Sequence, residues 1–241
     1  MYEESPKLEP PSDSRQPLWR YMPAHRLKEL LTIKKIFFCN LHSLTDGLEG
    51  TLTQRTRNHA VKWHMQTHKY TLEQAYQAVA DYESFQKEMY VNCWHMNRHE
   101  SYLMWKVYSN EKGYAIKTHY ERIKSAFIDT PCKITGGKVT YVDFETEGTP
   151  LGNLFDHVAT KDLPYEDERE FRLVYWDLKE TSEEIIKTND GFLIPVDINM
   201  LIQSIVESPE ISDIDPELEL LIYEYGIPIQ RSKIINRKND K

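Results

Sequence analysis

The sequence predicts an α+β fold, a single domain in which a mixed or antiparallel sheet is flanked by helices. Expected strands outnumber expected helices, and the two do not alternate regularly as they do around a parallel sheet. No repeat or low-complexity linker interrupts the middle of the 241-residue chain, which is long enough to bury a core. We therefore expect one domain over residues 18–235, a flexible leader over 1–17, which is rich in Pro, Ser and charge, and a disordered tail over 236–241.

Hydrophobic periodicity and capping signals define the elements of the first half of the chain. Leucines that share one face predict a helix over 23–35, whose first turn suits Pro23. A longer helix is expected to begin at Thr71, because Thr71 and Gln74 form the pattern of a capping box. Apolar, β-rich runs predict strands over 18–22 and 36–40, and an Asp-Gly turn predicts a loop over 41–51.

The second half of the chain is predicted to be richer in strands. A short aromatic helix is expected over 101–109, and two closing helices over 199–208 and 216–226. A Gly-Gly pair predicts a hairpin-like turn that opens a strand within 134–145. Further strands are expected over residues 89–96, 114–118, 168–176, 191–198 and 227–234.

The composition is typical of a globular protein and excludes one broad class of function. Charged residues make up 28% and hydrophobic residues 40% of the chain, so a packed core with a solvated surface is expected. The net charge of −8 excludes a protein that binds polyanions over its whole surface. Neither a signal peptide nor an apolar run of membrane-spanning length is visible. We expect a cytoplasmic protein with no membrane partner.

The segment "YEDEREFRLVYW", residues 165–176, is the first candidate site. Alternation along a strand places three apolar residues, beginning with Phe171, on one face and Glu168, Glu170 and Arg172 on the other. A carboxylate at the mouth of a cleft can stabilise a developing cation or orient a sugar hydroxyl. Alternatively, these charges pair across strands or protect a sheet edge. Both interpretations remain open at this point.

The aromatic helix over 101–109 is the second candidate. Ser101, Trp105 and Tyr108 lie on one side of it and could form the wall of a pocket for a flat ligand by stacking. The alternative is that Trp105 and Tyr108 are core anchors.

A local basic window is the third candidate. No Asp or Glu occurs from Gly50 to Leu72, although the chain as a whole is acidic. The same window contains Arg55, Arg57 and Lys62, which suit the phosphates of a nucleic acid or a nucleotide. The alternative is a solvated helical face that compensates acids elsewhere.

No metal site is predicted. Cys93, His95 and His99 lack a fourth ligand, so a buried structural cysteine is the simpler interpretation of Cys93. His42, Asp46 and Glu49 lie close together in the loop over 41–51, where an Asp-Gly turn with surface carboxylates is a commoner outcome than a metal site. A metal-dependent nuclease that uses these two acids with Glu168 has the least support in the sequence.

Four segments in order resemble a bacterial family. "FFCNLHSLTDGLEGT", "VNCWHMNRHESYLMWKVYSNEKGYAIK", "KVTYVDF" and, after Lys161, "YEDEREFRLV" are similar to domain-of-unknown-function family 2971. The resemblance runs from about Leu18 to the final helices, and it departs at Gly47, where the family usually has proline. It implies a bacterial protein in a defence or toxin context, such as phage defence, but no particular reaction.

The order of these segments also resembles, more distantly, the ADP-ribosyltransferase fold. The likeness implies that NAD is a substrate, that Glu170 or Glu168 holds the nicotinamide ribose, and that the nucleotide is bound by Arg20, Tyr21, Ser101, Trp105 and Tyr108. The first strand lacks the histidine of that fold, and its usual tyrosine has no clear equivalent. The implied function is an NAD-using transferase or NAD-cleaving enzyme with a nucleic acid or protein acceptor. The alternative function is a non-enzymatic module that binds nucleic acid or protein through the window 55–69.

Overall fold

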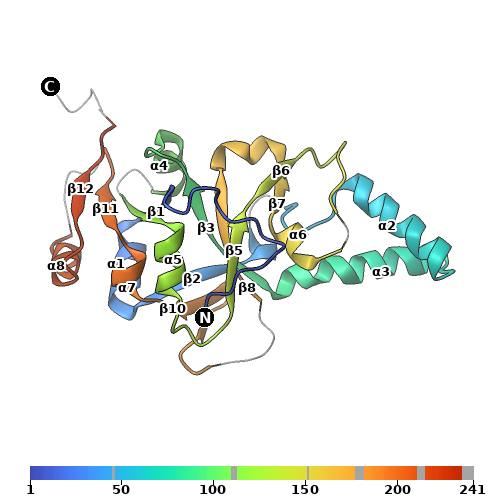
Figure 1. The fold of residues 1–241 in the computed structure, drawn as a ribbon, viewed down its shortest axis with the longest axis horizontal. Coiled ribbons are helices and arrows are strands. Elements are labelled where there is room, and N and C mark those ends of the chain that lie inside the picture. The colour runs from blue at the N-terminus through green and yellow to red at the C-terminus, as the bar shows by residue number, and fades with distance from the viewer. Residues whose placement is uncertain (45–46, 110–112, 151, 177–181, 211–214, 235–241) are drawn as a thin grey trace.

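The protein has a mixed, mostly antiparallel sheet with helices on both faces, as the predicted α+β class requires (Figure 1). The computed structural model describes residues 1–44, 47–109, 113–150, 152–176, 182–210 and 215–234. Within these residues the main sheet has ten strands, and β6 and β7 form a separate parallel pair. The predicted tail over 236–241 lies outside the described residues.

Most predicted elements occur close to their expected positions. The strands are β1 (Pro17–Pro23), β2 (Lys35–Asn40), β3 (Met89–Met96), β4 (Gly113–His119), β5 (Ile134–Lys138), β6 (Thr140–Val142), β7 (Thr160–Asp162), β8 (Glu170–Trp176), β9 (Ile186–Lys187), β10 (Gly191–Pro195), β11 (Ser204–Glu207) and β12 (Ile229–Arg231). The helices are α1 (Ala24–Ile33), α2 (Gln54–Thr67), α3 (Leu72–Ser84), α4 (Tyr102–Tyr108), α5 (Tyr120–Ala126), α6 (Leu154–Val158), α7 (Ile198–Leu201) and α8 (Pro216–Glu224), with 3-10 turns η1 (Leu41–Ser43), η2 (Phe85–Glu88) and η3 (Leu163–Glu168). In the described part of the chain, none of the helices is long and apolar enough to cross a bilayer.

The main sheet is split at β3. One edge of β3 pairs with β8 along its length, from Met89 to His95. The other edge pairs with β1 at His95 and Met96, and with β2 at Tyr90 and Val91. Because β1 and β2 diverge from each other between these contacts, the middle of β3 has no strand beside it on that edge. Two side chains occupy the gap: Asn92 donates to the Phe37 carbonyl at 2.8 Å, and Arg20 donates to the Cys93 carbonyl at 2.7 Å.

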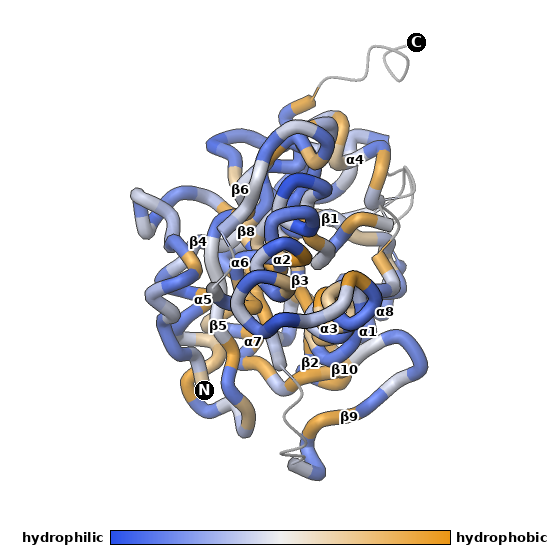
Figure 2. Tube along the Cα trace, turned by 90° about the vertical axis from the view of Figure 1, so that its right-hand side faces the viewer, coloured by the Kyte–Doolittle hydropathy of each residue, from blue (hydrophilic) through white to orange (hydrophobic). Residues whose placement is uncertain are grey.

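The two faces of the sheet carry different helices. The larger core lies on the face covered by α1, α5, α7 and α8, where Leu27, Ile123, Leu201 and Leu218 are among the buried residues. On the opposite face, α4 packs Trp105 against β1, while α6 and η1 cover a smaller core. Figure 2 shows the apolar segments gathered in the interior strands and a mostly hydrophilic α2. Helices α2 and α3 pack on each other and project from the body as an arm (Figure 1).

The N-terminal segment is packed against the sheet, whereas the sequence predicted a flexible leader. Tyr2 forms a bridge with Ile134 at the start of β5, and its hydroxyl donates to the Tyr120 hydroxyl at 3.2 Å. Leu8 is 2% exposed within the smaller core. A few apolar residues spaced along this polar segment therefore fix it on the domain, and composition alone does not reveal them.

Two other predictions were wrong in detail. Gly136 and Gly137 lie inside β5 instead of forming a turn. The close approach of β8 explains the glycine at 136, since a Cβ there would come within 3.0 Å of side chains on β8. The helix expected over 199–208 is a single turn, α7, followed by the strand β11. Ile205 and Val206 are both buried, since β11 lies between β4 and β12 with both faces covered, and such a continuous apolar run does not distinguish strand from helix.

Candidate functional site

A pocket of about 440 Å³ lies on the face of the sheet that carries α4. Strands β1, β3 and β8 form its floor, while α4, η1 and η3 contribute to its walls. Its aromatic and apolar lining includes Trp19, Tyr21, Val91, Trp94, Met104 and Tyr165. Its polar lining includes Arg20, Glu49, Cys93, His95, Tyr108, Lys161, Glu168 and Glu170. The pocket thus unites five of the residues predicted from the sequence: Arg20, Tyr21, Tyr108, Glu168 and Glu170.

Strand alternation explains why Glu170 reaches this pocket. On β8, Phe171, Leu173 and Tyr175 belong to the larger core, as predicted, so Glu170 and Arg172 face the opposite side. In the ladder with β3, Glu170 lies opposite His95. Since β8 lies between β3 and β5, it is not an edge strand, and the charges on it do not serve to protect an edge.

Glu170 is the centre of a buried ion-pair network. Its Oε2 accepts from Arg172 Nε at 3.0 Å and Nη2 at 2.8 Å, and its Oε1 accepts from Lys161 Nζ at 2.9 Å. Arg172 also donates to both carboxylate oxygens of Glu49, at 2.8 and 3.1 Å. Lys161 lies 2.6 Å from Glu168 and 3.1 Å from Glu49. Each cation therefore contacts more than one carboxylate, which is the arrangement that buried charges require.

The network contains three carboxylates and two cations. It shifts the pKa values of Glu170 on β8 and Glu168 on η3 in opposite directions. Burial alone would raise the pKa of Glu170, but Arg172 and Lys161 hold it well below its ordinary range. Burial raises the pKa of Glu168, and the neighbouring Glu170 carboxylate raises it further against the opposing effect of Lys161. Glu168 is therefore the acid suited to gaining and losing a proton, and Glu170 stays ionised.

Glu168 enters the pocket from η3 and does not belong to the strand. Arg169, which follows it, has a φ of 42°, in the left-handed region that residues with a Cβ seldom adopt. This turn breaks the alternation that the sequence predicted from Glu168 to Glu170. The Glu168 carboxylate accepts from the Tyr108 hydroxyl at 3.0 Å, and its side chain is 19% exposed, against 7% for Glu170. Of the two acids, Glu168 is the more accessible from the pocket.

Arg20 supplies a positive charge that no carboxylate neutralises among the described residues. Its Nη1 donates to the Cys93 carbonyl within the split between β1 and β2. Burial lowers its pKa, but an arginine in a protein stays protonated. Because Arg20 lines the pocket and pairs with none of the described carboxylates, its guanidinium is available to bind an anionic group of a ligand.

Ser101 and Trp105 do not line the pocket, although the sequence assigned them to it. Ser101 is the N-cap of α4, and its backbone N–H donates to the Tyr21 hydroxyl at 2.8 Å. Trp105 is 2% exposed and packs edge-on against the Tyr21 ring, with centroids 4.8 Å apart. Both residues therefore hold Tyr21 in place behind the pocket wall.

The predicted nucleic-acid-binding residues lie on the arm, apart from the pocket lining. Arg57 is ion-paired with Glu83 of α3 at 2.6 Å. Arg55 and Lys62 are exposed on α2 and border a shallow hollow that Glu145 also lines. The basic window therefore forms a separate surface.

Sequence reasoning missed the partners of Glu170. Glu49 was interpreted as a surface carboxylate, yet it is 4% exposed and paired with Arg172. Lys161 was noticed through the family resemblance alone, and it also lies 4.8 Å from the ring of Tyr165. No local pattern marks Glu49, because Arg172 lies 123 residues away in the chain. Lys161 lies only nine residues from Glu170, so its charge close to the acidic segment was a local signal.

The structure offers no clear set of metal ligands. In the described part of the chain, no three His, Cys, Asp or Glu side chains are grouped so that they could hold a metal ion. Asp46 lies outside the described residues, and Glu49 and Glu168 both contact Lys161. Cys93 is a pocket residue whose pKa is raised by burial, so its thiol stays protonated and is a poor ligand or nucleophile.

Comparison of the chain with family models, curated proteins and solved structures finds no match. The resemblances to family 2971 and to the ADP-ribosyltransferase fold therefore remain predictions from the sequence.

Proposed function

We propose that the protein is an NAD-using enzyme of the ADP-ribosyltransferase type, with its active site in the pocket of about 440 Å³. The observation that carries the proposal is that one pocket unites an aromatic wall, the Glu168–Glu170 carboxylate pair and Arg20, which pairs with none of the described carboxylates. This volume falls within the range of small-molecule and cofactor sites. The segments that meet there are also those on which the sequence resemblance rests.

The lining suggests how a dinucleotide would be held. Arg20 would donate to the pyrophosphate, since its guanidinium matches phosphate oxygens in geometry and charge. The rings of Tyr21 and Trp19 offer surfaces for the flat nicotinamide, which is cationic in NAD and so is attracted to an aromatic face. Tyr21 is fixed by Ser101 and Trp105, so this wall is rigid before the ligand arrives.

The carboxylates supply the chemistry. Breaking the bond between the ribose C1 and the nicotinamide nitrogen leaves the electron pair on nicotinamide and a cationic sugar, which a nearby carboxylate stabilises. Glu168 is accessible and would contact the ribose hydroxyl, then take the proton of the water or acceptor group that attacks the sugar. Glu170 acts as a positioning residue, since both its oxygens accept from cations and it fixes Lys161 beside Glu168.

The test is the release of nicotinamide from NAD, with and without nucleic acid and protein acceptors. We expect Glu168→Gln to lower the rate by orders of magnitude, because a catalytic carboxylate contributes on that scale. Glu166→Gln is the matched control, since Glu166 is an exposed acid in the same turn. The absence of release by the native protein under all conditions, or an equal rate in Glu168→Gln, contradicts the proposal.

A further inference from the structure

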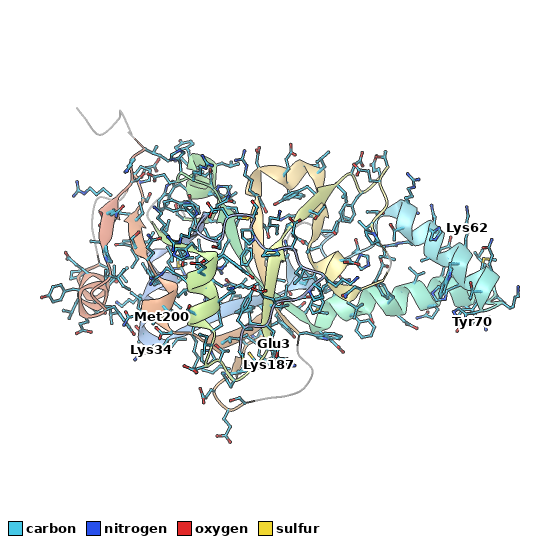
Figure 3. The ribbon with its side chains drawn as sticks, viewed as in Figure 1. Glu3, Lys34, Lys62, Tyr70, Lys187 and Met200 are labelled. Atoms are coloured by element: carbon cyan, nitrogen blue, oxygen red, sulfur yellow. The ribbon has the colours of Figure 1, made fainter. Side chains whose placement is uncertain are left out.

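The outer end of the arm carries exposed aromatic rings. Trp63 near the end of α2 is 47% exposed, and Tyr70 in the connection to α3 is 40% exposed (Figure 3 labels Tyr70). The two helices pack on each other through smaller residues, chiefly Ala60, Val61 and Ala75. The large rings are therefore not needed for the packing of the arm.

These rings form an ordered cluster with two histidines. The Trp63 ring lies 4.9 Å from His64 and 5.0 Å from His68, centroid to centroid. His64 and Tyr70 are parallel, with an interplanar angle of 1° and centroids 5.7 Å apart. We call Trp63, His64, His68 and Tyr70 the arm-tip cluster. Trp63 meets both histidines edge-on, at interplanar angles of 74° and 81°, whereas Tyr70 is stacked on His64. Exposed rings such as those of Trp63 and Tyr70 offer surfaces on which unpaired bases can stack.

The charges around the cluster favour a polyanion. Arg55, Lys62 and Lys69 are exposed and have no ion-pair partner among the described residues. No acid occurs from Gly50 to Leu72, while the whole chain has a net charge of −8. Glu73, at the start of α3, is the first acid beyond the cluster. The α2 side of the arm is thus locally cationic on an acidic protein, whereas α3 carries Glu73, Asp81 and Glu83. A cationic surface beside exposed rings suits the phosphates of a nucleic acid.

We propose that the arm-tip cluster and the neighbouring cations bind single-stranded nucleic acid, with bases stacked on Trp63 and Tyr70 and phosphates near Lys62 and Lys69. Stacking needs unpaired bases, so a single strand is favoured over a duplex. This inference does not depend on the proposed reaction, because the cluster lies outside the pocket lining.

The test is fluorescence anisotropy of the full-length protein with a labelled oligothymidine and with a duplex of the same length. We expect the single strand to bind more tightly, and binding to weaken steeply as salt is raised. Trp63→Ala combined with Tyr70→Ala should weaken binding by about tenfold or more. Tyr223→Ala is the matched control, since Tyr223 is 82% exposed on α8 at the other end of the molecule (Figure 1).

A second pair of substitutions tests the contribution of Lys62 and Lys69. Lys62→Glu combined with Lys69→Glu should weaken binding and reduce its salt dependence, whereas Lys34→Glu, on an exposed residue far from the arm in Figure 3, should not. Equal affinity of the aromatic double variant and the native protein overturns the proposal, and so does preference for the duplex. Self-association that Trp63→Ala abolishes, without oligonucleotide binding, would identify a protein interface instead. The assay contains no NAD, so its outcome is independent of nicotinamide release.

Discussion

Arg172 and Glu170 lie two residues apart on β8, and Arg172 donates to the same carboxylate oxygen of Glu170 through both Nε and Nη2. Successive side chains on one face of a strand are usually parallel neighbours that do not hydrogen-bond so closely. Here the arginine turns back along the strand and still reaches Glu49 with its remaining donors. The pair thus fixes the direction of the Glu170 carboxylate at the base of the pocket.

Removal of Arg172 should strongly destabilise the fold. Arg172→Met leaves the carboxylates of Glu49 and Glu170 buried without this partner, which costs about 3–5 kcal/mol in comparable buried pairs. Chemical denaturation measures this as a lower free energy of unfolding. Arg15→Met is the control, since the Arg15 side chain is 81% exposed and a change within about 0.5 kcal/mol is expected. Equal stability of the two variants would show that the network is not structural.

The two glutamates of the pocket should affect stability in opposite ways as the pH changes. The pKa of Glu170 is lowered in the folded protein, so its ionisation stabilises the fold above the unfolded pKa of about 4.3, and this stabilisation is lost as the pH falls toward the folded pKa. The pKa of Glu168 is raised, so its contribution is present below the unfolded pKa and is lost as the pH rises through the folded value.

We therefore expect Glu170→Gln to lower the free energy of unfolding at neutral pH, with a deficit that shrinks on acidification. Glu168→Gln should be as stable as the native protein at neutral pH, or more stable. Denaturation curves from about pH 2 to about pH 8 distinguish the two variants, since the Glu170 contribution is lost only below its unfolded pKa of about 4.3. The same pH trend in both would contradict the division of the acids by their pKa values.

Arg20 should matter more for ligand binding than for stability. Since no described carboxylate depends on it, Arg20→Met removes a buried charge without leaving another one unpaired. Because the Cys93 carbonyl loses its donor, we expect the free energy of unfolding to fall by about 1–3 kcal/mol, while the affinity for ADP-ribose, measured by calorimetry, falls by about tenfold or more. Arg26→Met is the control because Arg26 is exposed and already paired with Glu29. A large loss of stability in Arg20→Met, with unchanged affinity, would reverse these assignments.

Gly137 should control the docking of the N-terminal segment. A Cβ at Gly137 would lie 2.7 Å from Leu8 Cβ and 2.8 Å from the Leu8 carbonyl carbon, closer than side chains tolerate. Gly137→Ala should displace this segment, with a cost of about 1–3 kcal/mol, and make it more sensitive to limited proteolysis. Gly152→Ala has nothing within 4 Å and should behave as the native protein.

Several residues of the pocket could be predicted from the sequence, but the contacts between them could not. Alternation correctly assigned the faces of β8, and the capping box at Thr71 correctly located the start of α3. These signals are local, and they depend on a few consecutive residues. The burial of Glu49 depends on Arg172, which is 123 residues away in the chain. No local pattern carries that information, and for the same reason the packing of Leu8 was not foreseen.

The split beside β3 is linked to ligand binding, because Arg20 belongs both to the split and to the pocket lining. Arg20 stands in for an absent backbone donor at the Cys93 carbonyl, and it is also the group placed to meet an anion. A ligand that draws the guanidinium toward itself competes with this backbone acceptor. Ligand binding in the pocket and the contact of Arg20 with β3 across the split are therefore linked equilibria. Saturation with ligand should change the rate of amide hydrogen exchange at the ends of β1 and β2 that face the split.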